Sequence, residues 1–351
     1  MDNIIKIEEF LELSKSIPVI DVRTPAEFIQ GNIAGSINIP LFSDEERTIV
    51  GTLYKHANRE KAVIQGLEFV GPKMAVFAKQ ALKIAKNKKL LLYCWRGGMR
   101  SNSMAWLFRS LNIEVATLLD GYKAYRRYGK EILAKEYNLI VLGGKTGSGK
   151  TEILHELKSL GEQVVDLEFL ANHKGSAFGF IGQKEQPINE DFENQLIEQF
   201  LKINPHKRIW IEDESKNVGK NVIPDELFNQ MKIKDLIFLE MPIELRVARL
   251  VNEYTDVNVE QLGFAVEKIR SRIGFENYEK AILFLKNRDF KSVAEITLRY
   301  YDKAYLLSLQ KRDENKLASA KRQIQISLDE PKITAKELII FANKNYKNEN
   351  N

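Results

Sequence analysis

The segment LIVLGGKTGSGKT, residues 139–151, decides how the second half of this chain folds. It opens with an apolar run typical of a buried strand, and its last eight residues match G-x-x-x-x-G-K-S/T. A strand that runs through such a loop into a helix is the setting of a phosphate-binding loop, or P-loop. Its residues are Gly144, Lys145, Thr146, Gly147, Ser148, Gly149, Lys150 and Thr151. We expect backbone N–H groups to wrap a diphosphate, Lys150 to offset its charge and the Thr151 hydroxyl to hold Mg²⁺.

Outward from the P-loop, the pattern predicts strands at 163–165, 208–211 and 236–239, and helices at 150–160, 190–203, 225–232 and 243–252. The run RIWIEDES, residues 208–215, is a strand that ends in acids. We predict that Asp213 faces the metal; the alternative is an acidic strand end without metal. Residues 257–325 have an amphipathic helical pattern, and 331–341 is predicted to form a last strand and helix.

The first half of the chain also alternates strands with helices. Strands are predicted at 18–20, 37–39, 90–93 and 115–118, with helices from Pro25, over 72–86 and after Ser101. Thr24 and Pro25 are suited to a helix start, as N-cap and first helical residue. The alternation predicts a mostly parallel, doubly wound α/β domain.

A single cysteine lies between the predicted strand 90–93 and the helix that follows it. The cysteine loop, residues 94–100, consists of Cys94, Trp95, Arg96, Gly97, Gly98, Met99 and Arg100. Its glycines allow successive N–H groups to point inward, and a helix N-terminus adds partial positive charge. We interpret the loop as an anion cradle around Cys94. The alternative is a buried structural cysteine.

Positive charge is concentrated in the middle of the chain, although the net charge is only +5. Residues 73–135 hold 14 basic and three acidic residues. Within them Arg126, Arg127 and Lys130 alternate with Tyr122, Tyr125 and Tyr128. We read the set as a footprint for nucleic acid that combines phosphate contacts with base stacking. The alternative is a solvated linker helix whose tyrosines pack inward.

Composition excludes several classes of protein. No window approaches a membrane span, the N-terminus is unlike a signal peptide, and one cysteine cannot form an internal disulfide. We therefore expect a cytoplasmic protein with no membrane partner, and the sequence leaves its oligomeric state open. We divide it into an α/β domain at 1–121, a basic connector at 122–137, a P-loop NTPase-like α/β domain at 138–256 and a mainly helical region at 257–351.

Two stretches of the first domain resemble the rhodanese signature. They are DVRTPAEF, residues 21–28, and GNIAGSINIP, residues 31–40, followed by the cysteine loop. Asn32 stands where rhodaneses usually carry histidine, and the loop is one residue longer than the commoner C-R-x-G-x-R. The wider cradle argues against a plain thiosulfate sulfurtransferase.

A rhodanese-like domain joined to a P-loop domain closely resembles the bacterial tRNA 2-selenouridine synthase family. The resemblance rests on residues 50–55, 94–101, 166–179 and 211–215, with 298–302 as a further element, and spans roughly residues 10–310. It implies an enzyme that replaces the sulfur of wobble 2-thiouridine in a tRNA anticodon arm with selenium. Geranyl diphosphate would first alkylate the sulfur. Selenium from selenophosphate, carried on Cys94 as an S-selanyl group, would then displace the thiogeranyl group.

The implied reaction consumes no nucleoside triphosphate, so we expect the P-loop to grip geranyl diphosphate. Both donors are co-substrates, and no organic cofactor is expected. His173 lies in one of the resembling segments and is a candidate ligand contact or proton donor, or else a structural histidine. Two other functions stay open: a rhodanese-type sulfurtransferase fused to an ATP- or GTP-dependent P-loop enzyme, and a non-enzymatic tRNA-binding or sulfur-carrier module.

Overall fold

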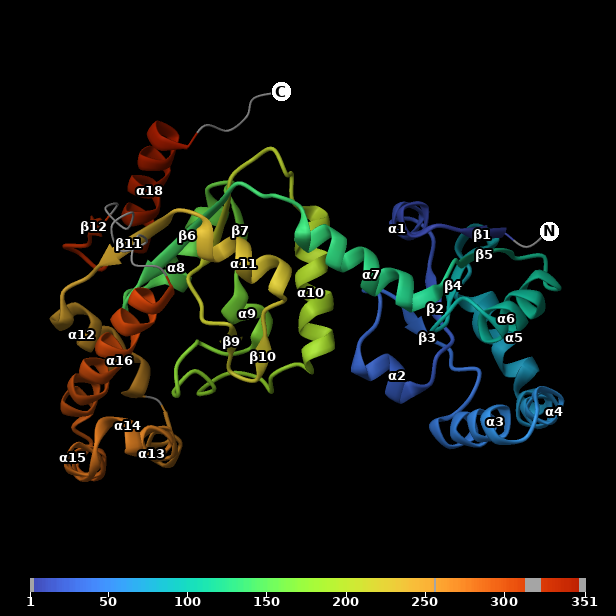
Figure 1. Ribbon diagram of the computed structural model, residues 1–351, viewed down its shortest axis with the longest axis horizontal. Helices are drawn as coiled ribbons and strands as arrows, with labels where there is room; N and C mark the ends of the chain where they lie inside the picture. Colours follow the sequence, from blue (N-terminus) through green and yellow to red (C-terminus); the bar gives the residue numbers. More distant parts are fainter. Residues whose placement is uncertain (1–2, 256, 313–322, 347–351) are drawn as a thin grey trace. The chain divides into compact units, whose positions relative to one another are not determined.

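The computed structural model of the protein describes residues 3–255, 257–312 and 323–346. The chain divides into two compact units (Figure 1). The first comprises residues 1–132 and 193–198, and the second comprises residues 133–192 and 199–351. Each unit is built on its own five-stranded sheet.

The sheet of the first unit is entirely parallel, with strand order β1-β5-β4-β2-β3. Its strands are β1 (Asn3–Ile5), β2 (Val19–Asp21), β3 (Ile37–Asn38), β4 (Lys89–Tyr93) and β5 (Glu114–Leu118). The central strand β4 is apolar after its first residue and is buried on both faces. Burial on both faces requires helices on both sides, which confirms the predicted doubly wound arrangement.

The helices of the first unit are α1 (Ile7–Ser14), α2 (Pro25–Gln30), α3 (Asp44–His56), α4 (Arg59–Val70), α5 (Met74–Ile84), α6 (Met99–Arg109) and α7 (Gly121–Ala134), with short 3₁₀ turns at Gly71–Lys73 and Lys86–Lys88. Thr24 and Ser43 begin α2 and α3, each in a reciprocal hydrogen-bonded cap with the glutamate three residues later. Phe77 of α5 and Phe108 of α6 pack on one face of β4. Phe10 of α1 contacts Tyr93 on the other face.

The sheet of the second unit is also parallel, in the order β12-β11-β6-β8-β7. Its strands are β6 (Leu139–Gly144), β7 (Gln163–Val165), β8 (Ile209–Glu212), β11 (Leu236–Glu240) and β12 (Gln323–Gln325), and β9 (Asn217–Val218) and β10 (Asn221–Val222) form a separate antiparallel hairpin. The P-loop follows the central strand β6, so the topology sets it at the carboxyl edge of the sheet. That edge is where open α/β sheets bind ligands.

The remaining helices are α8 (Lys150–Ser159), α9 (Leu167–Ala171), α10 (Asn189–Lys202), α11 (Asp225–Ile233), α12 (Ile243–Thr255), α13 (Val259–Lys268), α14 (Arg270–Ile273), α15 (Phe275–Lys286), α16 (Phe290–Arg312) and α18 (Pro331–Asn345). Helices α12 to α16 bury a second apolar core of their own, separate from the core that α8 and α18 form with the sheet. The predicted helical region is thus confirmed from 257 to 312. Residues 313–322 of that prediction lie outside the described residues. At 323–325 the helical prediction was wrong, because these residues form strand β12, which pairs with β11.

The prediction of a strand within 331–341 was wrong. Pro331 occupies the first turn of α18, where a proline costs no hydrogen bond, and Thr334, Ala335, Leu338 and Ala342 form its buried stripe. The last strand of the sheet is instead β12, which pairs with β11 before that helix. The sequence reading also offered no element for residues 44–70, where the structure has α3 and α4.

Candidate active site

Cys94 sits where the predicted strand–loop–helix places it, between the end of β4 and the start of α6. The backbone N–H of Gly98 donates a hydrogen bond to its Sγ over 3.3 Å, and the Ser101 hydroxyl lies 3.3 Å from the same sulfur. Only 3% of the residue is exposed. The Gly98 N–H and the N-terminus of α6 both favour negative charge on this sulfur or on an atom attached to it.

The cysteine loop is held from behind by the start of α7. The N–H groups of Tyr122 and Lys123 donate to the carbonyl oxygens of Cys94 and Trp95 over 2.8 and 3.1 Å. This approach requires glycine at position 121, because a Cβ there would lie 2.2 Å from the Cys94 oxygen. The first residues of the predicted connector therefore support the cysteine loop.

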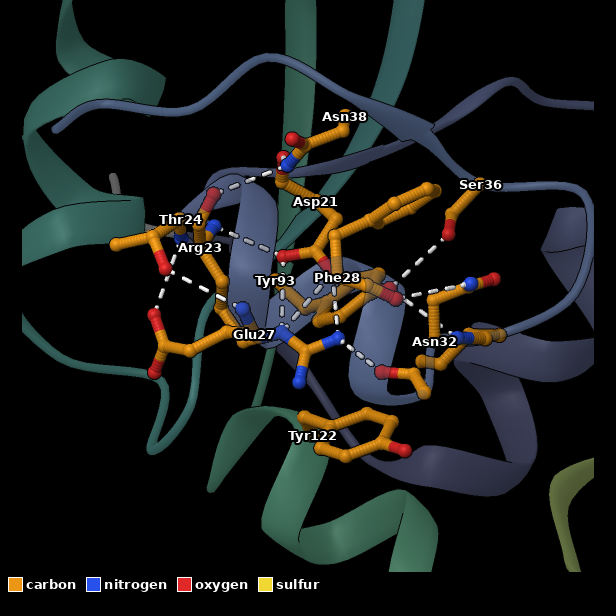
Figure 2. Close-up of polar contacts among 12 residues, drawn as sticks. Asp21, Arg23, Thr24, Glu27, Phe28, Asn32, Ser36, Asn38, Tyr93 and Tyr122 are labelled. Carbon is orange, nitrogen blue, oxygen red and sulfur yellow. Dashed lines mark hydrogen bonds and ion pairs between the residues drawn. The ribbon is translucent and has the colours of Figure 1, made fainter. Parts of the chain in front are cut away.

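Figure 2 shows an ion pair between Asp21 and Arg23, both fully buried. The pair lies next to the cysteine loop, since the Arg23 guanidinium is 5.9 Å from the ring centre of Trp95. The guanidinium donates to both Asp21 carboxylate oxygens and to the Gly31 carbonyl, and it lies 3.8 Å from the ring centre of Tyr122. Asp21 and Arg23 of the rhodanese-like signature thus support the loop, and no ligand can reach them because both are fully buried. Asn32 is also structural, since its side-chain amide donates to the Phe28 carbonyl.

The two arginines of the cysteine loop have different surroundings. Arg96 is exposed, whereas Arg100 forms an ion pair with Glu27 at 2.6 Å. Burial alone would raise the pKa of Glu27, but the hydrogen bond and charge of Arg100 hold it below its usual value. Arg100 therefore has a fixed position at the loop, and Arg96 is the arginine open to solvent.

In the second unit the P-loop connects β6 to α8, as the motif predicts. Gly147 and Gly149 have φ of +79° and +75°, a conformation that favours glycine. Lys150 Nζ donates to the Gly144 carbonyl over 3.0 Å, and Lys145 pairs with Glu240 at 2.8 Å. The buried Ser148 hydroxyl has no hydrogen-bond partner. A buried, unsatisfied donor in a loop of this shape suits a phosphate oxygen.

Three acids lie near the P-loop. The Thr151 hydroxyl donates to Glu168 at 3.0 Å, and the Glu168 N–H donates to Glu212 at 3.0 Å. Asp213, the acid predicted to face the metal, accepts a hydrogen bond from Tyr305 at 2.7 Å, and its role toward a metal stays a prediction. Sequence reasoning missed Glu168 as a site residue, although it lies within the resembling segment 166–179.

Burial raises the pKa of Glu168 and, with added repulsion from neighbouring acids, raises that of Glu212 well above its usual range. One oxygen of Glu212 is buried without a partner. Within the described ranges, no group of three or more His, Cys, Asp or Glu side chains is arranged to hold a metal ion. Hydroxyl and carboxylate oxygens are nevertheless the ligands that Mg²⁺ takes when a bound phosphate supplies the rest.

A cavity of about 310 Å³ extends from the P-loop into the helical part of the second unit. Besides the P-loop and the charged side chains of Lys174, Arg249 and Glu253, its lining includes a set of apolar and aromatic residues: Phe178, Ile181, Leu250, Tyr254, Val257 and Tyr301. Phe178 stacks on Tyr254 with ring centres 5.7 Å apart. Burial raises the pKa of Tyr301 to about 12, so its hydroxyl is neutral at pH 7. The site thus joins a phosphate cradle to an apolar chamber.

His173 is not among the residues that line this cavity. Its ring is buried, its Nδ1 has no hydrogen-bond partner, and burial lowers its pKa. A neutral imidazole set back from the cavity resembles the structural alternative more than the proton donor.

The predicted tRNA contacts lie on α7 and differ in exposure. Arg127 and Lys130 are exposed, and Arg127 lies 3.3 Å from Asp120. Arg126 is half-buried, donates to Asn194 at 2.6 Å and forms an ion pair with Glu193. The idea that Tyr122 and Tyr125 stack on bases was wrong, because both are fully buried against the loop.

Across the described residues, no helix has the length and apolar character needed to span a membrane. A rhodanese-like domain family matches residues 6–128, and the family described as the tRNA 2-selenouridine synthase AAA domain matches residues 137–287. Curated relatives match both units together.

The following three relatives are each named tRNA 2-selenouridine synthase. The protein of Shewanella frigidimarina is 34% identical, over 89% of this chain and 93% of its own. That of Nitrosomonas europaea is 31% identical, over 85% and 90%. That of Psychromonas ingrahamii is 34% identical, over 84% and 88%.

Proposed function

The chain belongs to the tRNA 2-selenouridine synthase family, and we propose that it replaces the sulfur of wobble 2-thiouridine in tRNA with selenium in two steps. In the first step the thiouridine sulfur attacks C1 of geranyl diphosphate. The S–C1 bond forms, the C1–O bond breaks, and diphosphate leaves with the electron pair. In the second step the selenium of selenophosphate, held in the cradle beside Cys94, attacks C2 of the base, and the C2–Se bond forms as the C2–S bond breaks. Geranylthiolate leaves with the electron pair and takes up a proton, and water then cleaves the Se–P bond to release phosphate and 2-selenouridine.

The alkylation step is needed because the sulfur of 2-thiouridine is a poor leaving group. A thiocarbonyl carbon holds its sulfur tightly, whereas an S-alkyl group departs readily as a thiolate. The cysteine loop suits the second step because the Gly98 N–H and the N-terminus of α6 stabilise an anion at Cys94.

The observation that carries the assignment of geranyl diphosphate is the junction of P-loop and apolar chamber. One cavity of about 310 Å³ contains both parts: the P-loop at one place suits a diphosphate, and Phe178, Leu250 and Tyr254 in the same lining suit an apolar chain attached to it. Lys150 would offset the charge of the departing diphosphate. Thr151 and Glu168 would hold Mg²⁺ brought with it, and the ion would supply further positive charge.

The exposed Arg127 and Lys130 on α7 are the proposed phosphate contacts for the tRNA. They lie on the helix whose first residues fix the Cys94 backbone, so one element would couple RNA binding to the position of the cysteine loop.

The test uses the purified protein with an anticodon stem-loop RNA that carries 2-thiouridine. Geranyl diphosphate alone should yield the S-geranyl nucleoside, and adding selenophosphate should yield 2-selenouridine, both read by nucleoside mass spectrometry. Nucleotide hydrolysis without a geranylated product would instead support a sulfurtransferase fused to an ATP- or GTP-dependent enzyme. Binding of tRNA with no product from either donor would support a non-enzymatic module.

A further inference from the structure

The first unit contains a second, larger cavity, of about 850 Å³, and Cys94 forms part of its wall. The opposite wall comes from α3, α4 and the segment before α3, and Figure 1 shows these two helices side by side. Its apolar side chains include Leu41, Phe42, Val50, Val63 and Val70. A selenium anion is small and charged, so its binding alone does not account for so large an apolar cavity.

The mouth of the cavity exposes large apolar side chains to water. Tyr54, Leu67 and Met99 are 60%, 65% and 50% exposed, and all three line the cavity. Single exposed apolar residues are ordinary, but a set that converges on a reactive cysteine is typical of a ligand site.

Residues 50–55 were singled out in the sequence, and the two-step reaction leaves them without a role. They lie on α3, and four of them, Val50, Gly51, Tyr54 and Lys55, line the cavity. Their place in the structure points to the chemistry at Cys94 and away from the P-loop, which belongs to the other unit.

Positive charge lies near Cys94 in this cavity. Arg47, Arg96 and Arg100 line it together with Cys94 and Glu27, Arg47 is close enough to Arg100 and Cys94 to feel their charges, and Lys55 on α3 is a further cation of the lining. The α4 side contributes Ala62, Val63 and Leu67. A ligand that matches this division is anionic where it meets the cysteine and carries a long apolar tail.

We propose that this cavity holds the geranyl group of S-geranyl-2-thiouridine while selenium is transferred, an inference that rests on the proposed function. Selenium at Cys94 must come within bonding distance of C2, so the sulfur on C2 and the start of its tail must also lie beside Cys94. The nucleophile is the selenium of selenophosphate held beside Cys94. The C2–Se bond forms as the C2–S bond breaks, geranylthiolate leaves with the electron pair and takes up a proton, and water then cleaves the Se–P bond to release phosphate. A ten-carbon tail of roughly 300 Å³ leaves room in the cavity for part of the base.

The first test compares two stem-loop RNAs, one with S-geranyl- and one with S-methyl-2-thiouridine, as substrates of the full-length protein with selenophosphate. Each buried methylene contributes about fourfold to binding, so kcat/KM for formation of 2-selenouridine should favour the geranyl RNA by about 100-fold or more. The uncatalysed reaction of each RNA with selenophosphate corrects for intrinsic reactivity.

The second test fills the cavity. Val63→Phe should lower the geranyl-to-methyl ratio of kcat/KM by about tenfold, because the new ring occupies the space of the tail. Ile64→Phe is the matched control, since Ile64 is the next residue of α4, is 58% exposed and does not line the cavity; its ratio should equal that of the unmodified protein. Leu67→Gln, at an exposed position that tolerates polarity, should lower the ratio about fivefold and guards against misfolding of Val63→Phe.

The outcomes separate the two ideas. Conversion of both RNAs with a ratio near one, or a ratio untouched by folded Val63→Phe and by Leu67→Gln, would overturn the geranyl cavity and leave the proposed function standing. Failure of the unmodified protein to convert either S-alkyl RNA would overturn the proposed function itself.

Discussion

The Gly98 N–H points at the Cys94 sulfur from 3.3 Å, as a donor to a thiolate or to an atom bound to it would. Gly98 is the last residue before α6, so this hydrogen bond aligns the partial positive charge of the helix with the same sulfur. The buried Asp21–Arg23 pair and the start of α7 hold the loop from the other side. The anion site is therefore present before any substrate binds, which is what transition-state stabilisation requires.

Replacing Cys94 with serine should abolish selenium incorporation and leave the fold nearly unchanged. A serine hydroxyl can keep the contacts with Gly98 and Ser101, but it lacks the polarisable sulfur beside which the selenium is held. Formation of the S-geranyl nucleoside should continue, because that step is assigned to the other unit. Nucleoside mass spectrometry reads both products, and a serine variant that makes 2-selenouridine at the normal rate would remove Cys94 from the mechanism.

The basic residues of α7 should separate into two classes. Arg127→Ala with Lys130→Ala should weaken binding of all tRNAs about equally and reduce the slope of log K against log salt by about two, one for each phosphate contact. The measurement is a filter-binding or fluorescence titration over a salt series. An unchanged slope would mean that these two residues are solvated surface residues that do not contact the tRNA phosphates.

Arg126 should behave differently from its neighbours, since its guanidinium is committed to Asn194 and Glu193. Arg126→Ala should lower the free energy of unfolding by about 2 kcal/mol, the usual scale for hydrogen bonds to a charged group, and should change the salt slope little. A loss of slope equal to that of an exposed lysine would show that Arg126 leaves its partners to bind phosphate.

Much of this fold could be predicted because both reactive loops directly follow central strands. The apolar runs of β4 and β6, and the glycines after them, are local signals that tertiary context did not override. Helices α3 and α4 were missed for a physical reason. Their apolar residues are shared between the core and an open cavity, so residues such as Tyr54 and Leu67 break the amphipathic pattern.

The supporting residues of the site were beyond sequence reasoning because their role depends on distant parts of the chain. Arg23 reads as a surface charge, yet it is fully buried against Asp21 and Tyr122. Gly121 has a positive φ and lies against the Cys94 carbonyl, and the local sequence does not show that this carbonyl leaves no room for a side chain there. Glu168 lies on α9, 17 residues after Thr151, and only the fold brings the two side chains together.

Stability should depend on pH through Glu162, a half-buried carboxylate before β7, at the opposite end of that strand from the P-loop edge of the sheet. It accepts hydrogen bonds from Arg208 and from the Trp210 ring, which hold its pKa below the usual value although burial opposes this. A lowered pKa in the folded state stabilises the protein above the unfolded pKa of about 4.3, and that contribution is lost as the pH falls through the folded value.

Glu162→Gln should therefore lower the free energy of unfolding at pH 7 by about 2 kcal/mol, and the difference from the unmodified protein should shrink as the pH approaches 3. Urea unfolding at several pH values measures it. Glu136→Gln is the control. The Glu136 side chain also pairs with a lysine, Lys234, but it is 88% exposed, so this substitution should not change the free energy of unfolding measurably. A Glu162→Gln effect that is constant from pH 7 to pH 3 would mean that packing, and not charge, is what the glutamate supplies.

Lys150→Ala should block geranyl transfer and spare the delivery of selenium to Cys94. Cleavage of the bond between geranyl C1 and oxygen adds negative charge to the diphosphate, so a P-loop lysine stabilises the transition state more than the bound substrate. Loss of one such contact typically lowers the rate by about 10²–10³. Lys158→Ala, an exposed lysine on the same helix α8, is the matched control and should geranylate normally.

A chemically geranylated stem-loop decides whether Lys150 acts only in the first step. The Lys150→Ala protein should still convert this RNA to 2-selenouridine at close to the normal rate, because the substrate enters after the step that the lysine serves. If the variant geranylates normally but loses ATP binding, the P-loop holds a nucleotide, and the apolar chamber beside Phe178 and Tyr254 must serve another ligand.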